Sequence, residues 1–457
     1  MPYPSPVYVN RAAVAAVAAG NTAAAPAGPG PDKDGTSTLP PTETRERHPP
    51  PSSRAPALAL HRLLPGYAET PLHSLPSVAR ELGLGHVLLK DESRRFGLPS
   101  FKILGASWAV YRAVAEHLQR RSTGLDHHAA VSRLLDSLRG AGGWGADSPV
   151  VGPTAAATAT ATATATGREM GLGLELEIVT CTEGNWGRAV ARMAAYLGAA
   201  AVVYVPAHVP ETTRDLIRGE GAEVRVVEGS YDAAVDAARG AAEENDGALL
   251  VMDIGWEGYE TVPQWVVEGY QTMLDELDTQ VLRVTGGQPA THAVVPVGCG
   301  SIAQAVAQHF KRPAREPQGG SRAAAGAAGA GAAAAAVLGV EPDTAACLRA
   351  SLETGNMVSV PTQDSIMCGM NCGTLSTVAW PVLRTGVDAS VVVSDVEAHR
   401  AVTELEALGI QAGPCGASAL AALKRACEAE REKLQLSEKS VVILFSTEGR
   451  REYTAPA

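Results

Sequence analysis

A regular alternation of short apolar runs and amphipathic segments constrains the fold more than any other feature of the chain. Apolar runs of four to seven residues predict buried strands, and apolar residues at helical spacing between them predict helices. The expected strands are residues 86–90, 174–180, 200–206, 223–228, 248–254, 292–298, 337–342 and 440–446. The expected helices are residues 77–84, 103–118, 129–138, 187–197, 211–220, 231–244, 262–277, 394–408 and 416–434, with another from Ile302. Strands that alternate with helices indicate right-handed βαβ crossovers, so we expect an α/β fold with mostly parallel sheets.

The bulk composition narrows the class of protein. At 457 residues the chain is long enough for two domains, and a formal net charge of −11 argues against a nucleic-acid or anionic-membrane surface. No apolar run is long enough to span a bilayer. The seven cysteines show no CxxC pair and no zinc spacing with histidines, so we expect no metal site and a reduced, cytoplasmic protein. Residues 10–20 carry an arginine among small residues and leave an organelle presequence as the alternative.

Three segments have compositions that do not support a packed core. Residues 1–55 are rich in proline, alanine and threonine, and we expect them to form a disordered tail. Threonine–alanine and glycine–alanine tracts at about residues 140–167 and 313–336 are interpreted as low-complexity inserts. The folded body is therefore expected to start near residue 56.

The segment KDESRRFGLPSFKILGAS, residues 90–107, contains the first candidate for chemistry. It places Lys102 between Phe101 and Ile103, just ahead of an apolar run with helical spacing. Apolar neighbours desolvate an ammonium group and lower its pKa, which favours a lysine that forms an imine. The alternative is a solvated lysine beside a helix start.

A strand–loop–helix pattern at residues 178–191, IVTCTEGNWGRAVA, is the second candidate. Backbone N–H groups around Gly184 and Gly187 at the helix start could bind an anion, and Asn185 offers both a donor and an acceptor. An ordinary N-capping loop explains the same pattern.

The same pattern recurs twice in the C-terminal half. In VVPVGCGSIAQAV, residues 294–306, glycines at 298 and 300 let the backbone approach a phosphate and Ser301 adds a hydroxyl. In VVILFSTEGRRE, residues 441–452, Ser446 and Thr447 follow a strand at the edge where α/β proteins bind ligands. A plain βα turn and a simple strand exit are the respective alternatives. With Lys102 and Asn185, these loops supply the amine, phosphate cradle and ring partners that a pyridoxal phosphate enzyme needs.

Taken together, these stretches resemble the fold-type II pyridoxal-phosphate enzymes, and within them most closely the diaminopropionate ammonia-lyase family. The similarity extends over about residues 67–452. The stretches that carry it are YAETPLHSL, KDESRRFGLPSFKILGAS, TEGNWGRAVA, YVPAHVPETTRDLIRGEGAEV, YDAAV, MDIGWEGYE, VPQWVVEGYQT, VPVGCGS, GVEPDTAACL, IMCGMNCG and FSTEGRRE.

The resemblance implies two three-layer αβα domains with pyridoxal 5'-phosphate in the cleft between them. We expect residues 56–107 and 245–457 to form the large cofactor-binding domain and residues 108–244 the small domain. The resemblance also implies a homodimer. A disulfide between Cys347 and Cys372 is conceivable, and two free thiols are the alternative.

The resemblance also assigns roles to individual residues. Lys102 would hold the cofactor as an imine and act as the base at the substrate α-carbon, with Glu183 as the second acid/base. The expected cofactor contacts are Asn185 at the ring hydroxyl, Gly298, Cys299, Gly300 and Ser301 at the phosphate, and Ser446 (or Thr447) at the ring nitrogen. The expected substrate contacts are Thr182, Gly184, Tyr231 and Asp253, with the loop of residues 182–187 binding the carboxylate through its N–H groups.

The sequence departs from the family pattern at one loop. Where the family reads TDGNHG, this chain reads TEGNWG, with Glu183 for aspartate and Trp186 for histidine. The extra methylene of glutamate moves the carboxylate by about 1.5 Å, which can change the enantiomer that is handled. A carboxylate that only interacts with the helix dipole is the alternative role for Glu183.

The resemblance thus implies α,β-elimination of 2,3-diaminopropionate to pyruvate and two ammonia molecules, with a small amino acid as the substrate and neither nucleic acid nor membrane as a partner. A serine/threonine-type dehydratase or a β-replacement enzyme on the same fold is the alternative. A catalytically silent cofactor-binding scaffold is the non-enzymatic alternative.

Overall fold

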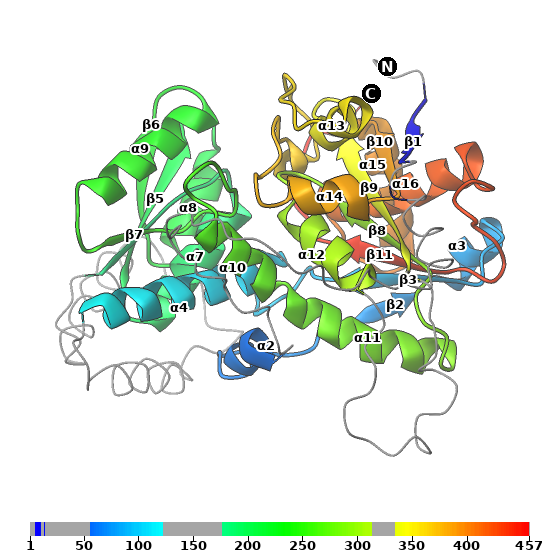
Figure 1. The fold of residues 1–457 in the computed structure, drawn as a ribbon, viewed down its shortest axis with the longest axis horizontal. Coiled ribbons are helices and arrows are strands. Elements are labelled where there is room, and N and C mark those ends of the chain that lie inside the picture. The colour runs from blue at the N-terminus through cyan, green and yellow to red at the C-terminus, as the bar shows by residue number, and fades with distance from the viewer. Residues whose placement is uncertain (1–4, 11–12, 14–54, 122–175, 313–333, 457) are drawn as a thin grey trace, which may run out of the picture.

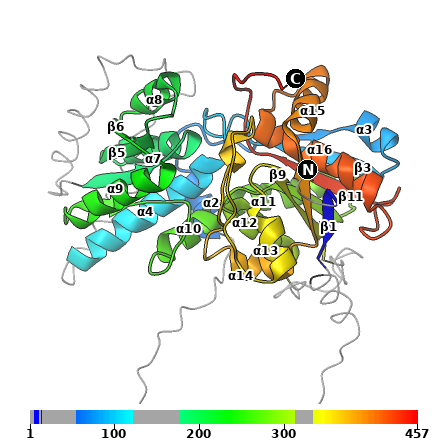
Figure 2. The same cartoon turned by 90° about the horizontal axis from the view of Figure 1, so that it is seen from above.

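The computed structural model describes residues 5–10, 13, 55–121, 176–312 and 334–456. Two lobes, each built on its own sheet, are visible in Figure 1 and again after a 90° turn in Figure 2. The short helix expected at residues 129–138, the insert at 140–167 and most of the insert at 313–336 lie outside the described residues.

The larger lobe is built on a seven-stranded sheet. In spatial order its strands are β1 (Val7–Val9), β10 (Ala389–Val393), β9 (Ala336–Pro342), β8 (His292–Pro296), β11 (Val441–Ser446), β3 (His86–Asp91) and β2 (Leu72–Ser74). The five central strands are parallel, and the edge strands β1 and β2 pair antiparallel with their neighbours.

Both edge strands correct the sequence interpretation. The prediction of a disordered tail is wrong for residues 5–10, because Val7–Val9 pairs in register with β10 and Asn10 hydrogen-bonds the backbone of Val387 at 2.8 Å. Pairing with an existing sheet edge stabilises a three-residue strand that its own composition could not. β2 likewise forms outside the strands expected from the sequence, by pairing with β3.

Helices cover both faces of this sheet because its strands are apolar on both sides. Val442 and Leu444 of β11 pack in one core with α3 (Pro76–Glu81), α15 (Asp395–Ala407) and α16 (Pro414–Ala429). Ile443 and Phe445, which alternate with them, pack in the other core. The helices that contribute to that core are α2 (Ala55–His61), α11 (Gln271–Thr285), α12 (Ser301–Phe310), α13 (Cys347–Thr354) and α14 (Trp380–Gly386). A one-turn 3-10 helix, η2 (Cys368–Met370), completes this lobe.

The smaller lobe is built on four parallel strands. In spatial order they are β6 (Glu223–Val227), β5 (Ala200–Pro206), β4 (Glu177–Cys181) and β7 (Ala248–Leu250). Its helices are α4 (Lys102–Arg121), α7 (Asn185–Tyr196), α8 (Glu211–Arg218) and α9 (Tyr231–Glu243). Because β7 pairs with β4, this sheet extends beyond the expected boundary at residue 244.

The expected helix at residues 262–277 is interrupted in the structure. It is replaced by α10 (Thr261–Gly269) and α11, which meet at Tyr270. Gly269 lies so close to the carbonyl of Leu104 that a side chain at 269 would overlap it, and a Cβ on Gly105 would lie 2.7 Å from the Tyr270 ring. This close packing fixes the start of α4 against the helix pair that joins the two lobes.

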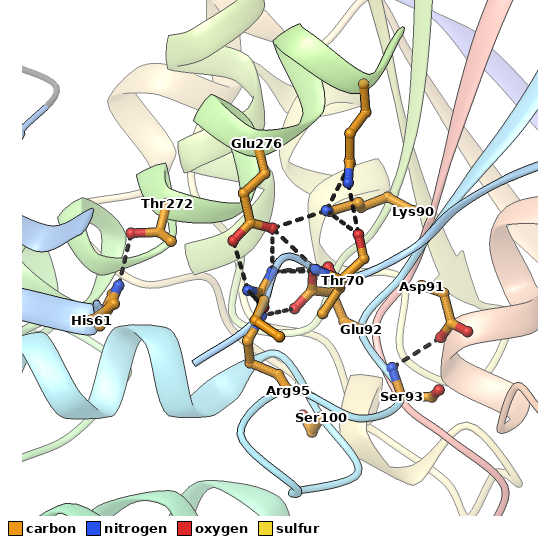
Figure 3. A network of polar contacts seen from close by, with 12 residues as sticks. His61, Thr70, Lys90, Asp91, Glu92, Ser93, Arg95, Ser100, Thr272 and Glu276 are labelled. Atoms are coloured by element: carbon orange, nitrogen blue, oxygen red, sulfur yellow. Dashed lines mark hydrogen bonds and ion pairs between the residues drawn. The ribbon is translucent and has the colours of Figure 1, made fainter. Parts of the chain in front are cut away.

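A buried ionic network holds the segment that leads into α4 (Figure 3). Arg95 donates to Glu276 at 2.7 and 2.8 Å and to Glu92 at 2.7 and 2.8 Å. Lys90 donates to Glu276 at 2.9 Å and to the carbonyl of Thr70 at 2.9 Å. The four charged side chains are at most 2% exposed and carry two charges of each sign. The network thus anchors residues 90–95 to α11, seven residues before Lys102.

Candidate active site

Lys102 is the first residue of α4, and its side chain is 24% exposed. Its Nζ donates to Asp253 Oδ2 at 2.7 Å and lies 6.0 Å from the centre of the Trp186 ring. Burial by itself lowers the pKa of Lys102, but the charge and the hydrogen bond of the Asp253 carboxylate outweigh burial and leave the pKa above its ordinary value. The predicted lowering of this pKa is therefore wrong in this structure, because the apolar flanks are not the only neighbours of the ammonium group.

Asp253 is the residue through which the two lobes contact each other beside Lys102. It follows β7 of the small sheet, and its side chain is 9% exposed. Its backbone carbonyl accepts a hydrogen bond from Cys299 Sγ at 3.4 Å, in the loop after β8 of the large sheet. Burial raises the pKa of Tyr231 well above its ordinary value, and Cys181, Asp253 and Cys299 add to this effect. Of the predicted substrate residues, Asp253 is thus the one that the structure joins directly to Lys102.

The loop after β8 forms a narrow turn at the start of α12. Gly300 has φ +94°, and a Cβ there would lie 2.8 Å from Leu383 Cδ1. A Cβ on Gly298 would lie 3.2 Å from the carbonyl oxygen of Gly369. Within the described ranges, no side chain caps the N-terminus of α12, which begins at the buried Ser301. Free N–H groups at this helix start suit a phosphate group.

Ser446 lies at the carboxyl end of β11, completely buried. Its Oγ has no hydrogen-bond partner among the described residues, and a Cβ on Gly416 would lie 2.7 Å from it. The segment holding Lys102 runs alongside, since Phe101 N donates to the carbonyl of Thr447 at 3.3 Å. A buried hydroxyl without a partner costs free energy, so this position suits a ligand that supplies the missing acceptor or donor.

The loop of residues 182–187 is held by its own threonine. Thr182 Oγ1 accepts hydrogen bonds from the N–H groups of Gly184 at 3.0 Å and Gly187 at 3.1 Å. These two N–H groups are therefore already engaged, which corrects the expectation that the whole loop offers its backbone to a carboxylate. Asn185 begins α7 and is half-buried. Trp186 is buried, and its Nε1 donates to Thr180 Oγ1 at 2.9 Å.

Glu183 is the outermost of the predicted site residues. Its side chain is 37% exposed, and its Oε1 lies 2.9 Å from His208 Nε2 in the loop after β5. Among the described residues no hydrogen bond joins Glu183 to Lys102. The pair with His208 could not be expected from the sequence, because the two residues are 25 positions apart on different loops.

Sequence reasoning also missed a buried tyrosine at this site. Tyr270 is 0% exposed and packs against Phe101, with ring centres 4.9 Å apart. Its hydroxyl has no hydrogen-bond partner among the described residues. The available signal was a tyrosine directly after Gly269 in the expected helix at residues 262–277.

These residues fit pyridoxal phosphate. The cofactor needs an amine, an anion site for its phosphate and a partner for its ring nitrogen. The structure offers the Lys102 amine, the loop of residues 298–301 and the Ser446 hydroxyl for these three roles. The fold and the site thus define the class of fold-type II pyridoxal-phosphate-dependent enzymes.

Comparisons with known proteins support this class and narrow it. The "Pyridoxal-phosphate dependent enzyme" family matches residues 155–447. Diaminopropionate ammonia-lyase from Salmonella typhimurium is 30% identical over 413 residues, covering 86% of this chain and 88% of that protein. Two crystal structures of the Escherichia coli enzyme are similar, each covering 86% of this chain and 87% of that one. The complex with D-serine has a TM-score of 0.66 and 28% identity, and the complex with an aminoacrylate-PLP azomethine reaction intermediate 0.63 and 27%. The chain belongs to the diaminopropionate ammonia-lyase family, pyridoxal-phosphate-dependent carbon–nitrogen lyases.

Proposed function

We propose that the protein converts 2,3-diaminopropionate and water to pyruvate and two molecules of ammonia by α,β-elimination. The observation that supports this substrate is the carboxylate of Asp253, 9% exposed and 2.7 Å from the Lys102 ammonium group. A buried carboxylate that already holds one ammonium group can hold another, and the β-amino group distinguishes diaminopropionate from serine.

Bound pyridoxal phosphate supplies an electron sink for the α-carbanion. Lys102 is proposed to hold the cofactor and then to take the α-proton at its Nζ. Ser446 offers the ring nitrogen a neutral hydroxyl, which leaves the ring largely unprotonated and suits elimination better than transamination. Asn185 is proposed to face the ring hydroxyl, and the N–H groups of residues 298–301 the phosphate.

The remaining residues are proposed to handle the substrate. Asp253 binds the β-ammonium group and keeps it near the α-carbon, while Tyr231 lines the same side. Glu183 delivers or removes the second proton from the outer side of the site, where His208 holds its carboxylate at 2.9 Å. Thr182 Oγ1 fixes the loop so that the first N–H groups of α7 can bind the substrate carboxylate.

The wider properties of the protein are proposals too. We propose a two-domain enzyme, a homodimer in the cytoplasm, with neither a nucleic acid nor a membrane as partner. In the described part of the chain, no helix is both long and apolar enough to cross a membrane.

The substrate is tested by measuring 2-oxo acid release, which is pyruvate from L- and D-2,3-diaminopropionate and from serine, and 2-oxobutanoate from threonine. We expect turnover of at least one diaminopropionate enantiomer to exceed that of both hydroxy amino acids. Faster turnover of serine or threonine would favour the dehydratase alternative, and a thioether product with added thiol would favour β-replacement. A silent scaffold would bind the cofactor, with an absorbance band at roughly 410–430 nm, and release no 2-oxo acid from any of the four.

A further inference from the structure

Tyr270 occupies an unusual position for a core tyrosine. Its ring fills the contact between α4 and the α10–α11 junction, and its hydroxyl is sealed from water with no hydrogen-bond partner among the described residues. Tyrosine hydroxyls in protein interiors usually find a partner, because an unpaired one loses the hydrogen bonds that it makes with water. Two other tyrosines do have hydrogen-bond partners for their hydroxyls. Tyr259 donates to the carbonyl of Leu250 at 2.7 Å, and Tyr67 donates to Glu276 at 3.1 Å.

The surroundings of the hydroxyl indicate what its missing partner is. Burial raises the pKa of Tyr270 well above its ordinary value, Asp253 and Cys299 add to this effect, and a side-chain interaction with Ser301 opposes it. Ser301 is the first residue of α12, and Cys299 lies two positions earlier in the same glycine loop. Because α12 packs against both α10 and α11, which meet at Tyr270, and Ser301 interacts with the hydroxyl, the hydroxyl lies near the anion site that the N-terminus of α12 forms. The raised pKa keeps it protonated.

We infer that Tyr270 is a further cofactor-binding residue, whose hydroxyl donates a hydrogen bond to the phosphate group of pyridoxal phosphate. The inference rests on the proposed cofactor of this site. A neutral phenol adjacent to a phosphate dianion acts purely as a donor, so it complements the backbone N–H groups of residues 298–301. The close approach of Gly105 and Gly269 holds the ring in place, so the donor is in position before the cofactor arrives.

The test compares pyridoxal phosphate with pyridoxal, which lacks the phosphate, as ligands of the full-length apoprotein. The variant is Tyr270→Phe, and the matched control is Tyr259→Phe, which removes another largely buried hydroxyl whose partners are backbone groups. For Tyr270→Phe we expect the dissociation constant of pyridoxal phosphate to rise about 10- to 100-fold, which corresponds to one hydrogen bond to a charged group. In Tyr270→Phe, the dissociation constant of pyridoxal should change less than about twofold. In Tyr259→Phe, the dissociation constants of both ligands should change less than about twofold or rise by the same factor.

A second readout needs no ligand. Tyr270→Phe removes an unpaired hydroxyl and should leave the apoprotein at least as stable to urea as the wild type, whereas Tyr259→Phe should destabilise it. In the holoenzyme, the ³¹P resonance of the bound cofactor should shift in Tyr270→Phe and stay in place in Tyr259→Phe.

Equal losses of affinity for pyridoxal phosphate and pyridoxal would overturn the inference, as would an unchanged ³¹P resonance. Uptake of pyridoxal phosphate by the wild-type apoprotein and release of pyruvate are measured separately. A failure of the Tyr270 contact is therefore distinguishable from a failure of the proposed function.

Discussion

Glu276→Gln is expected to destabilise the protein strongly, because Glu276 is the hub of the buried network shown in Figure 3. Its carboxylate accepts two hydrogen bonds from Arg95 and one from Lys90, all between 2.7 and 2.9 Å, and is 2% exposed. Glutamine keeps the shape of the side chain but removes its charge. The buried cations Lys90 and Arg95 then have Glu92 as their one remaining carboxylate in the network. Removing one partner from a buried ion pair costs about 3–5 kcal/mol. This corresponds to a change of more than about 100-fold in the unfolding equilibrium constant.

The control is Glu268→Gln, whose ion pair with Arg112 spans 3.5 Å with side chains 33% and 39% exposed. Such a pair contributes about 0–1 kcal/mol, so this variant should remain close to the wild type. Urea unfolding followed by tryptophan fluorescence measures both variants. A second comparison replaces Lys90 and Glu276 by methionine together, which restores charge balance and should recover part of the loss. Equal stability losses in Glu276→Gln and Glu268→Gln would refute the reasoning.

Three further predictions concern the site and its pH dependence. Asp253→Asn removes the carboxylate proposed to hold the β-ammonium group, so the KM for diaminopropionate should rise about 10- to 100-fold while the KM for serine changes less. Equal changes in the two KM values would contradict that role. Glu183→Asp should change the ratio of turnover of D- and L-diaminopropionate, with Glu183→Gln as the control without a carboxylate. An unaltered ratio in both variants would indicate that Glu183 only interacts with the helix dipole. Burial acts to raise the pKa of Glu276, yet Arg95 and Lys90 hold it below its ordinary value of 4.5. The stability that Glu276 confers is therefore present above pH 4.5 and lost as the pH falls below it, and Glu276→Gln should show a flatter acid limb in pH-dependent urea unfolding.

The sequence predicted those features that depend on short-range patterns. The strand of residues 200–206 was predicted with its observed limits, because seven apolar residues between turn signals leave little choice. Lys102, the glycine loop at residues 298–301 and Ser446 became candidates for the same reason, since each lies at a strand end or helix start that the local pattern marks. In the structure, residues 298–301 and Ser446 lie at the carboxyl ends of the neighbouring strands β8 and β11, and Phe101, next to Lys102, donates to the carbonyl of Thr447.

The features that escaped prediction depend on partners distant in the sequence. Lys102 and Asp253 are 151 positions apart, and their contact reverses the predicted direction of the Lys102 pKa shift. Lys90 and Glu276 are 186 positions apart, so nothing local indicates that these charges are buried together. The break at Tyr270 and the pairing of Val7–Val9 with β10 likewise follow from packing and pairing, which periodicity alone does not encode.

The central claim is that Lys102 carries the cofactor, and chemical reduction of the holoenzyme tests it most directly. Borohydride converts an imine to a stable secondary amine, so peptide mass spectrometry of the reduced, digested protein locates the lysine. We predict the pyridoxyl group on Lys102 and its absence from Lys102→Ala. Lys90 is the natural comparison, since it is also buried but is committed to Glu276 and Gln280. A pyridoxyl group on Lys90, or on any lysine other than Lys102, would contradict the account.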